Sequence, residues 1–508
     1  MAYTRVRAVC LVGVDGHPVT VEVHIGTGKP AFVLTGMPDQ ALQQSRVRIR
    51  SAFANCGLQF PDNHTVVNLL PASVPKSGSG CDLAIATGLM AAMGTVPGDE
   101  LTDTVLLGEL GLDGRLRPVR GVLPMLLTAQ HSGARRAIVP IGNLAEAALV
   151  STMTTHGADS LAAVAERLRG ERTLPQAALE PSTGPEPPMP DLSEVVGQHG
   201  ARRALEIAAA GRHHMYLLGP PGTGKTMLAE RLPSILPPLT RDQALESTAL
   251  HSVAELLGGR TTRLLRHPPF SAPHHSATMP AMVGGGSFPL RPGAASIAHN
   301  GVLFLDEAPE FKREVLDALR QLLESGEVHI SRAAVSARFP ARIQLVLAAN
   351  PCPCGAGDPT GCGCTPSTRR RYLARLSGPL LDRVDIRLQL NPVPMSALLA
   401  DTTMPEGSTP VAARVAAARA AAAERWQNAG QPWRTNSQVP GSALRSRQWR
   451  LPRETTAAAD RLVDIGVLTG RGYDRVLRVA WSAADVNGRT RPGPAEIEEA
   501  AALRLGGL

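Results

Sequence analysis

The fold of this 508-residue chain is decided by the stretch Gly219-Pro220-Pro221-Gly222-Thr223-Gly224-Lys225-Thr226. It matches the phosphate-binding pattern GxxxxGK[ST]. Its setting also fits, because the apolar run 215–218 predicts a buried strand before it and residues 226–230 predict a helix after it. Glycines let backbone N–H groups surround an anion, and the helix N-terminus adds its positive dipole end. We expect Lys225 to reach the β- and γ-phosphates and the Thr226 hydroxyl to hold Mg²⁺.

Composition and charge limit the remaining classes of protein. A chain of 508 residues is long enough for about two to four domains, each with its own core. No apolar run approaches the ~18 residues that cross a bilayer, and the start lacks a signal-peptide pattern, so we expect no membrane segment. Seven cysteines, an odd number, favour the reducing cytoplasm. The net charge of +8 permits a polyanionic partner. It does not require one, because the many arginines can reflect the composition of the genome alone.

Two further segments are expected to complete a nucleotide site. The apolar run 302–305 ends in Asp306 and Glu307, which predicts a strand followed by an acidic pair. Asp306 is expected to hold the Mg²⁺ shell, and Glu307 to polarise the attacking water. A buried strand expected over 342–349 ends in Asn350, where a γ-phosphate sensor would lie. Downstream of a complete phosphate loop, this pattern predicts ATP and Mg²⁺ as cofactors and ATP hydrolysis as the reaction.

Two arginines are candidates for completing an ATP site. Arg383 follows a short predicted helix and suits an arginine finger that acts on a neighbouring subunit. The alternative for Arg383 is an ion pair with Asp382 or Asp385 in the same chain. Beyond residue 400 the chain is alanine-rich, and Arg471, at the start of one expected helix, is a candidate second sensor. The helices expected there, which would form a lid over the nucleotide, are 411–427, 453–465, 471–487 and 494–505.

The N-terminal part of the chain is expected to form a separate α/β unit. Alternating residues at 19–25 predict a strand, as do the apolar runs at 66–70, 104–107 and 137–140. A proline-rich segment then marks the clearest boundary in the chain. We therefore divide the chain into an N-terminal domain (1–173), a linker (174–191), an ATPase core (192–397, with a cysteine-rich insertion at 351–365) and a helical lid (398–508).

The N-terminal unit resembles the Lon-protease-like fold in the stretch PKSGSGCDL around Gly80 and again over 108–119. That resemblance implies a peptidase whose serine is activated by a lysine. However, Gly80 stands where the Lon pattern places its serine, and Leu123 stands where it places its lysine. We therefore expect a non-catalytic domain. The neighbouring Ser79 and Lys76 leave a displaced dyad as the alternative.

The remainder of the chain resembles the magnesium-chelatase-like AAA+ ATPases. With the Lon-like unit in front, the resemblance points to the YifB/ComM branch and covers nearly the whole chain. It implies an α/β fold of three parts: a Lon-protease-like domain, an AAA+ P-loop domain and a C-terminal helical lid. It also implies a hexameric ATPase and a DNA helicase that promotes branch migration. The stretches that carry the resemblance are 191–198, 272–276, 283–286, 291–293, 299–301, 350–355 and 375–383.

Four cysteines within 13 positions predict a metal site. They are Cys352, Cys354, Cys362 and Cys364. Two Cys-x-Cys pairs can supply four thiolates to one tetrahedral Zn²⁺, and the glycines around them allow the turns required. The alternative is a reduced, turn-rich surface loop. For the adjacent pair His274 and His275 we expect a structural or subunit-interface role rather than metal binding.

A hairpin is predicted between the acidic pair and Asn350. Two short β-like runs, 328–331 and 334–338, flank Arg332 and Ala333. In related ring ATPases a hairpin inserted here points into the pore, so Arg332 is expected to contact a DNA phosphate without sequence preference. The glycine-rich segment 282–287 would form a companion loop. The alternative is an ion pair between Arg332 and Glu327 across the hairpin.

These features support one leading function and two competitors. The leading hypothesis is a hexameric, ATP-driven motor that acts on single-stranded or branched DNA. The first competitor is a chelatase-like remodelling ATPase that acts on a protein or metal-insertion partner. A true chelatase motor works with separate subunits and lacks a Lon-like domain, which argues against this competitor. The second, an ATP-dependent peptidase, is disfavoured by Gly80 at the nucleophile position.

Overall fold

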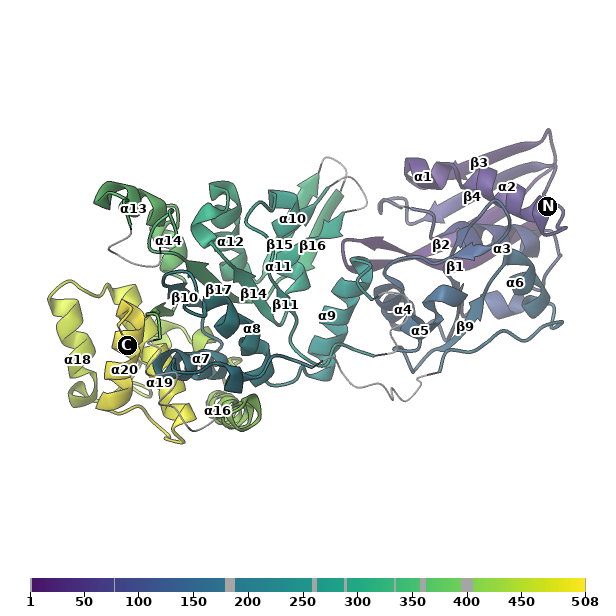
Figure 1. The fold of residues 1–508 in the computed structure, drawn as a ribbon. Helices are drawn as coiled ribbons and strands as arrows, with labels where there is room; N and C mark the ends of the chain where they lie inside the picture. Colours follow the sequence, from purple (N-terminus) through teal and green to yellow (C-terminus); the bar gives the residue numbers. More distant parts are fainter. Residues whose placement is uncertain are drawn as a thin grey trace.

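The computed structural model describes residues 2–76, 78–178, 188–257, 263–286, 290–332, 335–356, 362–393 and 405–507. Figure 1 shows three units that follow one another along the chain, from an N-terminal unit through a central sheet to a cluster of C-terminal helices. The N-terminal and central units each combine a sheet with helices, which confirms the predicted α/β fold class. None of the described helices is long and apolar enough to span a bilayer.

The N-terminal unit is built on a seven-stranded mixed sheet in the order β3-β4-β2-β1-β5-β8-β9. Strand β2 alternates buried and partly exposed residues, whereas β1 is buried at three consecutive positions, 8–10, because α3 and α4 both contact the hairpin that the two strands form. Helix α3 is buried on nearly all sides, because it lies against both strands of this hairpin. The strands are β1 (Ala2–Val12), β2 (Asp15–Ile25), β3 (Ala31–Thr35), β4 (His64–Leu70), β5 (Thr104–Leu106), β8 (Arg136–Pro140) and β9 (Thr154–Ala158), and the helices are α1 (Gln40–Gln43), α2 (Ser45–Asn55), α3 (Asp82–Ala92), α4 (Val122–His131), α5 (Leu144–Ala147) and α6 (Leu161–Leu168).

The central unit holds a five-stranded parallel sheet in the order β11-β14-β17-β10-β18. Its inner strands are entirely apolar or nearly so, which is typical of parallel strands covered on both faces. The strands are β10 (Met215–Leu218), β11 (Phe270–Ser271), β14 (Val302–Leu305), β17 (Gln344–Ala349) and β18 (Ile386–Gln389), and the longer helices are α7 (His199–Gly211), α8 (Lys225–Ile235), α9 (Arg241–Val253) and α12 (Arg313–Ser325).

The C-terminal helices form at the positions that the sequence predicts. They are α16 (Ser408–Asn428), α18 (Arg453–Asp464), α19 (Gly470–Val486) and α20 (Pro494–Leu505). All four tryptophans of the chain gather here, with ring centroids 4.7–6.0 Å apart around Trp426. Trp426 and Trp481 belong to the same apolar cluster as Met215 and Leu217 of β10, so the lid shares a core with the central unit. Helices α16 and α19 lie against α7, and α20 lies against β18, so the lid is fixed to the central sheet.

Two contacts illustrate how the N-terminal and central units pack together among the described residues. Helix α4 lies against α9, and the buried Glu146 carboxylate accepts hydrogen bonds from Ser252 of α9 and from the Leu123 backbone. At the turn between β1 and β2, Gly13 has φ of +69° and abuts strand β16 (Val335–Pro340). A methyl group added at Gly13 would lie 3.1 Å from Ala337 Cβ, so the positive φ favours glycine there and the tight contact with β16 adds to that preference.

Candidate nucleotide site

The phosphate loop lies where the sequence predicts it, between β10 and α8. Gly222 and Gly224 have φ of +77° and +84°, in the left-handed region that favours glycine. The loop follows β10 and therefore lies at the edge of the sheet formed by the carboxyl ends of the strands. Strand β10 has β17 on one side and β18 on the other, so strand order changes direction next to the loop. Crevices of this kind are the usual ligand sites of open parallel sheets.

Lys225 is held inside the loop. Its residue surface is only 8% exposed, and its Nζ donates to Gly219 O at 2.6 Å, Pro220 O at 2.8 Å and Asn350 Oδ1 at 3.1 Å. Burial lowers the pKa of the ammonium group, while the carboxylates that follow β14 oppose that shift. The contact with Asn350 brings the expected phosphate-binding lysine and the expected sensor asparagine together.

Thr226 and Asp306 form the oxygen pair expected for Mg²⁺. Thr226 Oγ1 donates to Asp306 Oδ2 at 2.8 Å, and the Glu307 backbone N–H donates to Asp306 Oδ1 at 2.9 Å. A hydroxyl and a carboxylate beside a phosphate loop fit the hard-oxygen preference of Mg²⁺. These residues would hold Mg²⁺, which when bound neutralises phosphate charge.

Glu307 stands in a strained conformation and faces His275, for which the sequence suggested a structural or subunit-interface role but no contact with Glu307. Its backbone has φ of +49°, which is uncommon for a residue other than glycine. Its Oε2 lies 3.2 Å from His275 Nδ1, and the rings of His274 and His275 lie 4.1 Å apart. The histidine pair therefore belongs to the site through Glu307. No spacing in the sequence could link residues 275 and 307, because the segment between them follows no repeating pattern.

Arg383 and Arg471 lie together, and away from the phosphate loop of their own chain. They line one cavity of about 580 Å³, and no residue of the loop 219–226, all of which is described, lines it. We call this space the finger cavity. Its other arginines are Arg212, Arg342, Arg475 and Arg478.

The side chain of Arg383 pairs with neither of the two aspartates considered from the sequence. Its guanidinium forms an ion pair with Glu324 of α12 and donates to Pro379 O at 2.6 Å. Burial lowers the pKa of Arg383, and the positive charges of Arg320, Arg475 and Arg471 act in the same direction. Four guanidinium groups in one region favour an anionic partner there.

The displaced peptidase dyad does not form. Lys76 is fully buried, and its Nζ donates to Pro71 O. Ser79 instead donates to the Glu109 carboxylate, at the wall of a cavity of about 290 Å³ between the N-terminal and central units. Because Ser79 makes no hydrogen bond to Lys76, this lysine does not activate the serine in the way the alternative requires.

The four clustered cysteines converge as a metal site would require. Their Sγ atoms all lie within 4.8 Å of one another, and three of the pairs are 3.1–3.4 Å apart. A tetrahedral zinc with Zn–S bonds of about 2.3 Å spaces its sulfurs about 3.8 Å apart, so the arrangement fits. Residues 357–361, including two of the glycines expected to form turns, lie outside the described residues.

The predicted hairpin forms from β15 (Glu327–Arg332) and β16. The expected tip residue Ala333 lies outside the described residues. Glu327 pairs with His329 at 3.4 Å and Arg338 at 3.5 Å, and not with Arg332. Because Glu327 and Arg332 are an odd number of positions apart on one strand, their side chains point to opposite faces. The alternative ion pair is therefore wrong.

Three family models match the chain in succession. The model described as "Subunit ChlI of Mg-chelatase" matches residues 21–143, "Magnesium chelatase, subunit ChlI" matches 191–398, and "Magnesium chelatase, subunit ChlI C-terminal" matches 405–504. Competence protein ComM of Haemophilus influenzae is 41% identical over 499 residues, which cover 97% of this chain and 96% of that relative. The chain belongs to the YifB/ComM group of magnesium-chelatase-like AAA+ proteins.

Other relatives agree with this membership. YifB of Escherichia coli is 41% identical over 492 residues, covering 96% of this chain and 94% of the relative. An uncharacterized protein of Mycobacterium tuberculosis is 49% identical over 507 residues, covering 100% of this chain and 99% of the relative. The N-terminal region is also similar to Lon protease of Chloroflexus aurantiacus, with 31% identity over 139 residues, 26% of this chain and 16% of that protein. The Lon-like unit and the AAA+ core of this YifB/ComM-group ATPase are both supported by these relatives.

The site makes opposite predictions for two substitutions. Lys225→Ala should abolish ATP binding, because the buried ammonium is lost from the phosphate loop. Glu307→Gln should keep ATP bound but lower turnover by about 10²–10⁴-fold, because only the water-activating carboxylate is removed. Binding of a fluorescent ATP analogue and release of phosphate measure the two effects. The exposed Glu314→Gln on α12 is the matched control, and near-normal turnover in Glu307→Gln would refute the assignment.

Proposed function

We propose that this protein is an ATP-driven, hexameric DNA motor that moves single-stranded or branched DNA through a ring. The observation that carries the proposal is Arg332, an exposed cation at the end of β15 that has no ion pair among the described residues. Its Nη2 would lie 4.0 Å from a methyl group added at Gly285, so the hairpin adjoins the glycine-rich segment expected as its companion loop. The name of the relative ComM, a competence protein, agrees with a DNA substrate.

A ring is supported by the position of Arg383. It precedes β18, whose parallel neighbour β10 carries the phosphate loop at its other end. Four strand residues span about 13 Å, so Arg383 and Lys225 lie at opposite edges of the sheet. An arginine placed in this way serves the ATP of an adjacent subunit, and Arg471 in the same cavity would serve the same nucleotide. A remodelling ATPase that acts on a protein or metal-insertion partner would have the same ring. Only the DNA contact of Arg332 distinguishes the proposed DNA motor from that alternative.

Zinc is proposed as a structural cofactor. The cysteine cluster begins two residues after Asn350, and a methyl group added at Gly355 would lie 3.7 Å from Pro221 Cγ of the phosphate loop. A zinc ion held by the four thiolates would therefore fix the backbone that follows the sensor asparagine. None of the seven cysteines, all of which are described, forms a disulfide, which agrees with the cytoplasm as the proposed compartment.

The DNA contact is tested by Arg332→Ala. We expect hexamer formation and basal ATPase activity to persist, while unwinding and stimulation by DNA are lost. The slope of log Kd against log salt should fall by roughly 0.7–0.9 for each phosphate contact removed. Arg338→Ala on the same hairpin is the control, because Arg338 already pairs with Glu327. If Arg332→Ala unwinds DNA normally, or if DNA never stimulates the parent ATPase, the proposal fails in favour of the remodelling ATPase.

Action in trans is tested by mixing Arg383→Ala protomers with Lys225→Ala protomers. Some interfaces of a mixed ring then carry both lesions and others carry neither. ATPase activity should recover partially relative to either variant alone, and ATP should favour the closed ring in sedimentation. Full-rate hydrolysis by a strictly monomeric preparation would show that the site is complete within one chain.

The metal site predicts about one zinc per chain in purified protein, measured by elemental analysis. Replacing Cys362 and Cys364 with serine should remove the zinc and destabilise the protein, because a structural zinc contributes folding energy. Cys56→Ser, which lies outside the cluster, should leave the zinc content unchanged. Absence of zinc together with four freely titratable cluster thiols in the native protein would exclude the site.

A further inference from the structure

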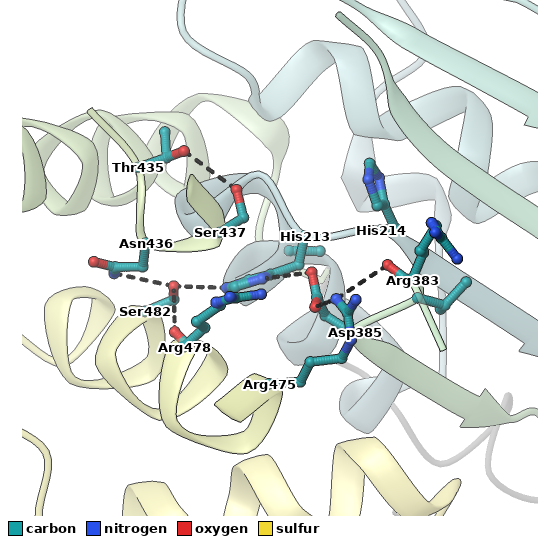
Figure 2. A network of polar contacts seen from close by, with 12 residues as sticks. His213, His214, Arg383, Asp385, Thr435, Asn436, Ser437, Arg475, Arg478 and Ser482 are labelled. Atoms are coloured by element: carbon teal, nitrogen blue, oxygen red, sulfur yellow. Dashed lines mark hydrogen bonds and ion pairs between the residues drawn. The ribbon is translucent and has the colours of Figure 1, made fainter. Parts of the chain in front are cut away.

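A chain of buried polar side chains connects the lid to the central sheet beside the finger cavity (Figure 2). Asp385 is 2% exposed and His213 is 0% exposed. His213 Nδ1 lies 3.1 Å from Asp385 Oδ2, and its Nε2 lies 2.8 Å from Ser482 Oγ on α19. The same hydroxyl accepts a hydrogen bond of 3.1 Å from Asn436 Nδ2. Such groups are costly to bury unless each has a partner, and here each one does.

Arg475 supplies the charge that compensates Asp385. Its Nη1 forms an ion pair with Asp385 Oδ1 and also donates to the backbone oxygen of Arg383 at 3.2 Å. Burial by itself would raise the pKa of Asp385, but Arg475 and His213 hold that pKa well below its usual range. The carboxylate therefore stays ionised at neutral pH and keeps Arg475 in place.

The network joins three elements. Arg475 belongs to lid helix α19, Asp385 directly precedes β18, and His213 precedes β10, which leads to the phosphate loop. A second lid contact reaches the same segment, because Arg504 of α20 donates to the backbone oxygen of Val384. Two lid arginines thus hold the consecutive carbonyl groups at positions 383 and 384.

The side chain of Arg383 is held less firmly than its backbone. Its guanidinium pairs with Glu324, whose side chain is 66% exposed, and donates to Pro379 O at 2.6 Å, while its Nε has no partner among the described residues. An ion pair with so exposed a partner is weak and easily exchanged. The guanidinium can therefore leave Glu324 for a phosphate while the lid contacts keep the Arg383 backbone in place.

We propose that Arg475 is a positioning residue for the Arg383 finger, anchored through Asp385 to His213. Arg475 does not touch the nucleotide in this role. It fixes the backbone from which Arg383 reaches the ATP of the adjacent subunit. The inference rests on the proposed action of Arg383 in trans. A shift of α19 would move the Arg383 backbone with it. The lid of one subunit would therefore influence hydrolysis in the next.

Arg475→Gln in the full-length protein tests the proposal. We expect kcat to fall about ten-fold or more, with the Kd for a fluorescent ATP analogue unchanged, because the protomer's own phosphate loop is intact. Adding Arg475→Gln to Arg383→Ala should lower kcat by no more than about two-fold further, since a positioning residue acts only through the group it positions. Asp385→Asn removes the anchoring charge at constant size and should act in the same direction.

Arg445→Gln is the matched control. It breaks another Arg–Asp ion pair on α19, with Asp474, and it touches neither Arg383 nor Asp385. Its kcat should stay within about two-fold of the parent.

Three results would overturn the inference. The first is parental kcat in an Arg475→Gln protein that binds the analogue, and the second is an additive loss of kcat when Arg475→Gln is combined with Arg383→Ala. The third is an equal loss of kcat in the Arg445→Gln control. If Arg475→Gln binds no analogue, Asp385→Asn decides by the same criteria. An Arg383→Ala protein with parental kcat would instead refute the finger itself.

Discussion

Parallel pairing in the central sheet is the constraint on which the nucleotide site depends. Because β10, β14 and β17 run in one direction, the residues that follow them meet at one edge, and Lys225, Asp306 and Asn350 become neighbours. The same polarity sends Arg383, which precedes β18, to the other edge. In the proposed ring, a subunit would therefore contribute Lys225 to one nucleotide site and Arg383 to the next, because strand direction separates the two side chains within one chain.

Two buried aspartates show how local surroundings set the pKa of a carboxyl group. Asp82 and Asp385 are both buried and both paired with an arginine. Burial raises the pKa of Asp82 to about 6, because the loss of solvation outweighs the opposing effect of Arg48, and the negative charge of Glu109 adds a smaller rise. Asp385 faces His213 as well as Arg475, and its pKa lies below the usual range. Asp385 at the lid junction therefore stays ionised near neutral pH, whereas Asp82 in the Lon-like unit changes its protonation near pH 6.

Sequence reasoning succeeded where a recognisable motif marks each residue, even for partners as distant as Thr226 and Asp306, and failed for contacts that no motif marks. The phosphate loop, the acidic pair after β14 and the four lid helices lie in contiguous patterns, and each occurs as predicted. The contact of His275 with Glu307 and the pairing of Arg383 with Glu324 join residues 32 and 59 positions apart. No periodicity marks such pairs, because packing of separate elements creates them. The position of Arg471 in the finger cavity likewise depends on how α19 docks, which helical propensity does not determine.

The contact between Gly13 and β16 connects the Lon-like domain to the predicted DNA-contacting hairpin. A hairpin that pulls on a polymer experiences recoil, and a free two-stranded hairpin is only marginally stable in water. Strand β16 is braced from behind by the β1–β2 turn, where Val12 is buried with Ala337 and Phe339 in one apolar cluster. If the hairpin pulls on DNA as proposed, this contact would let the Lon-like domain support β16 against the opposing force.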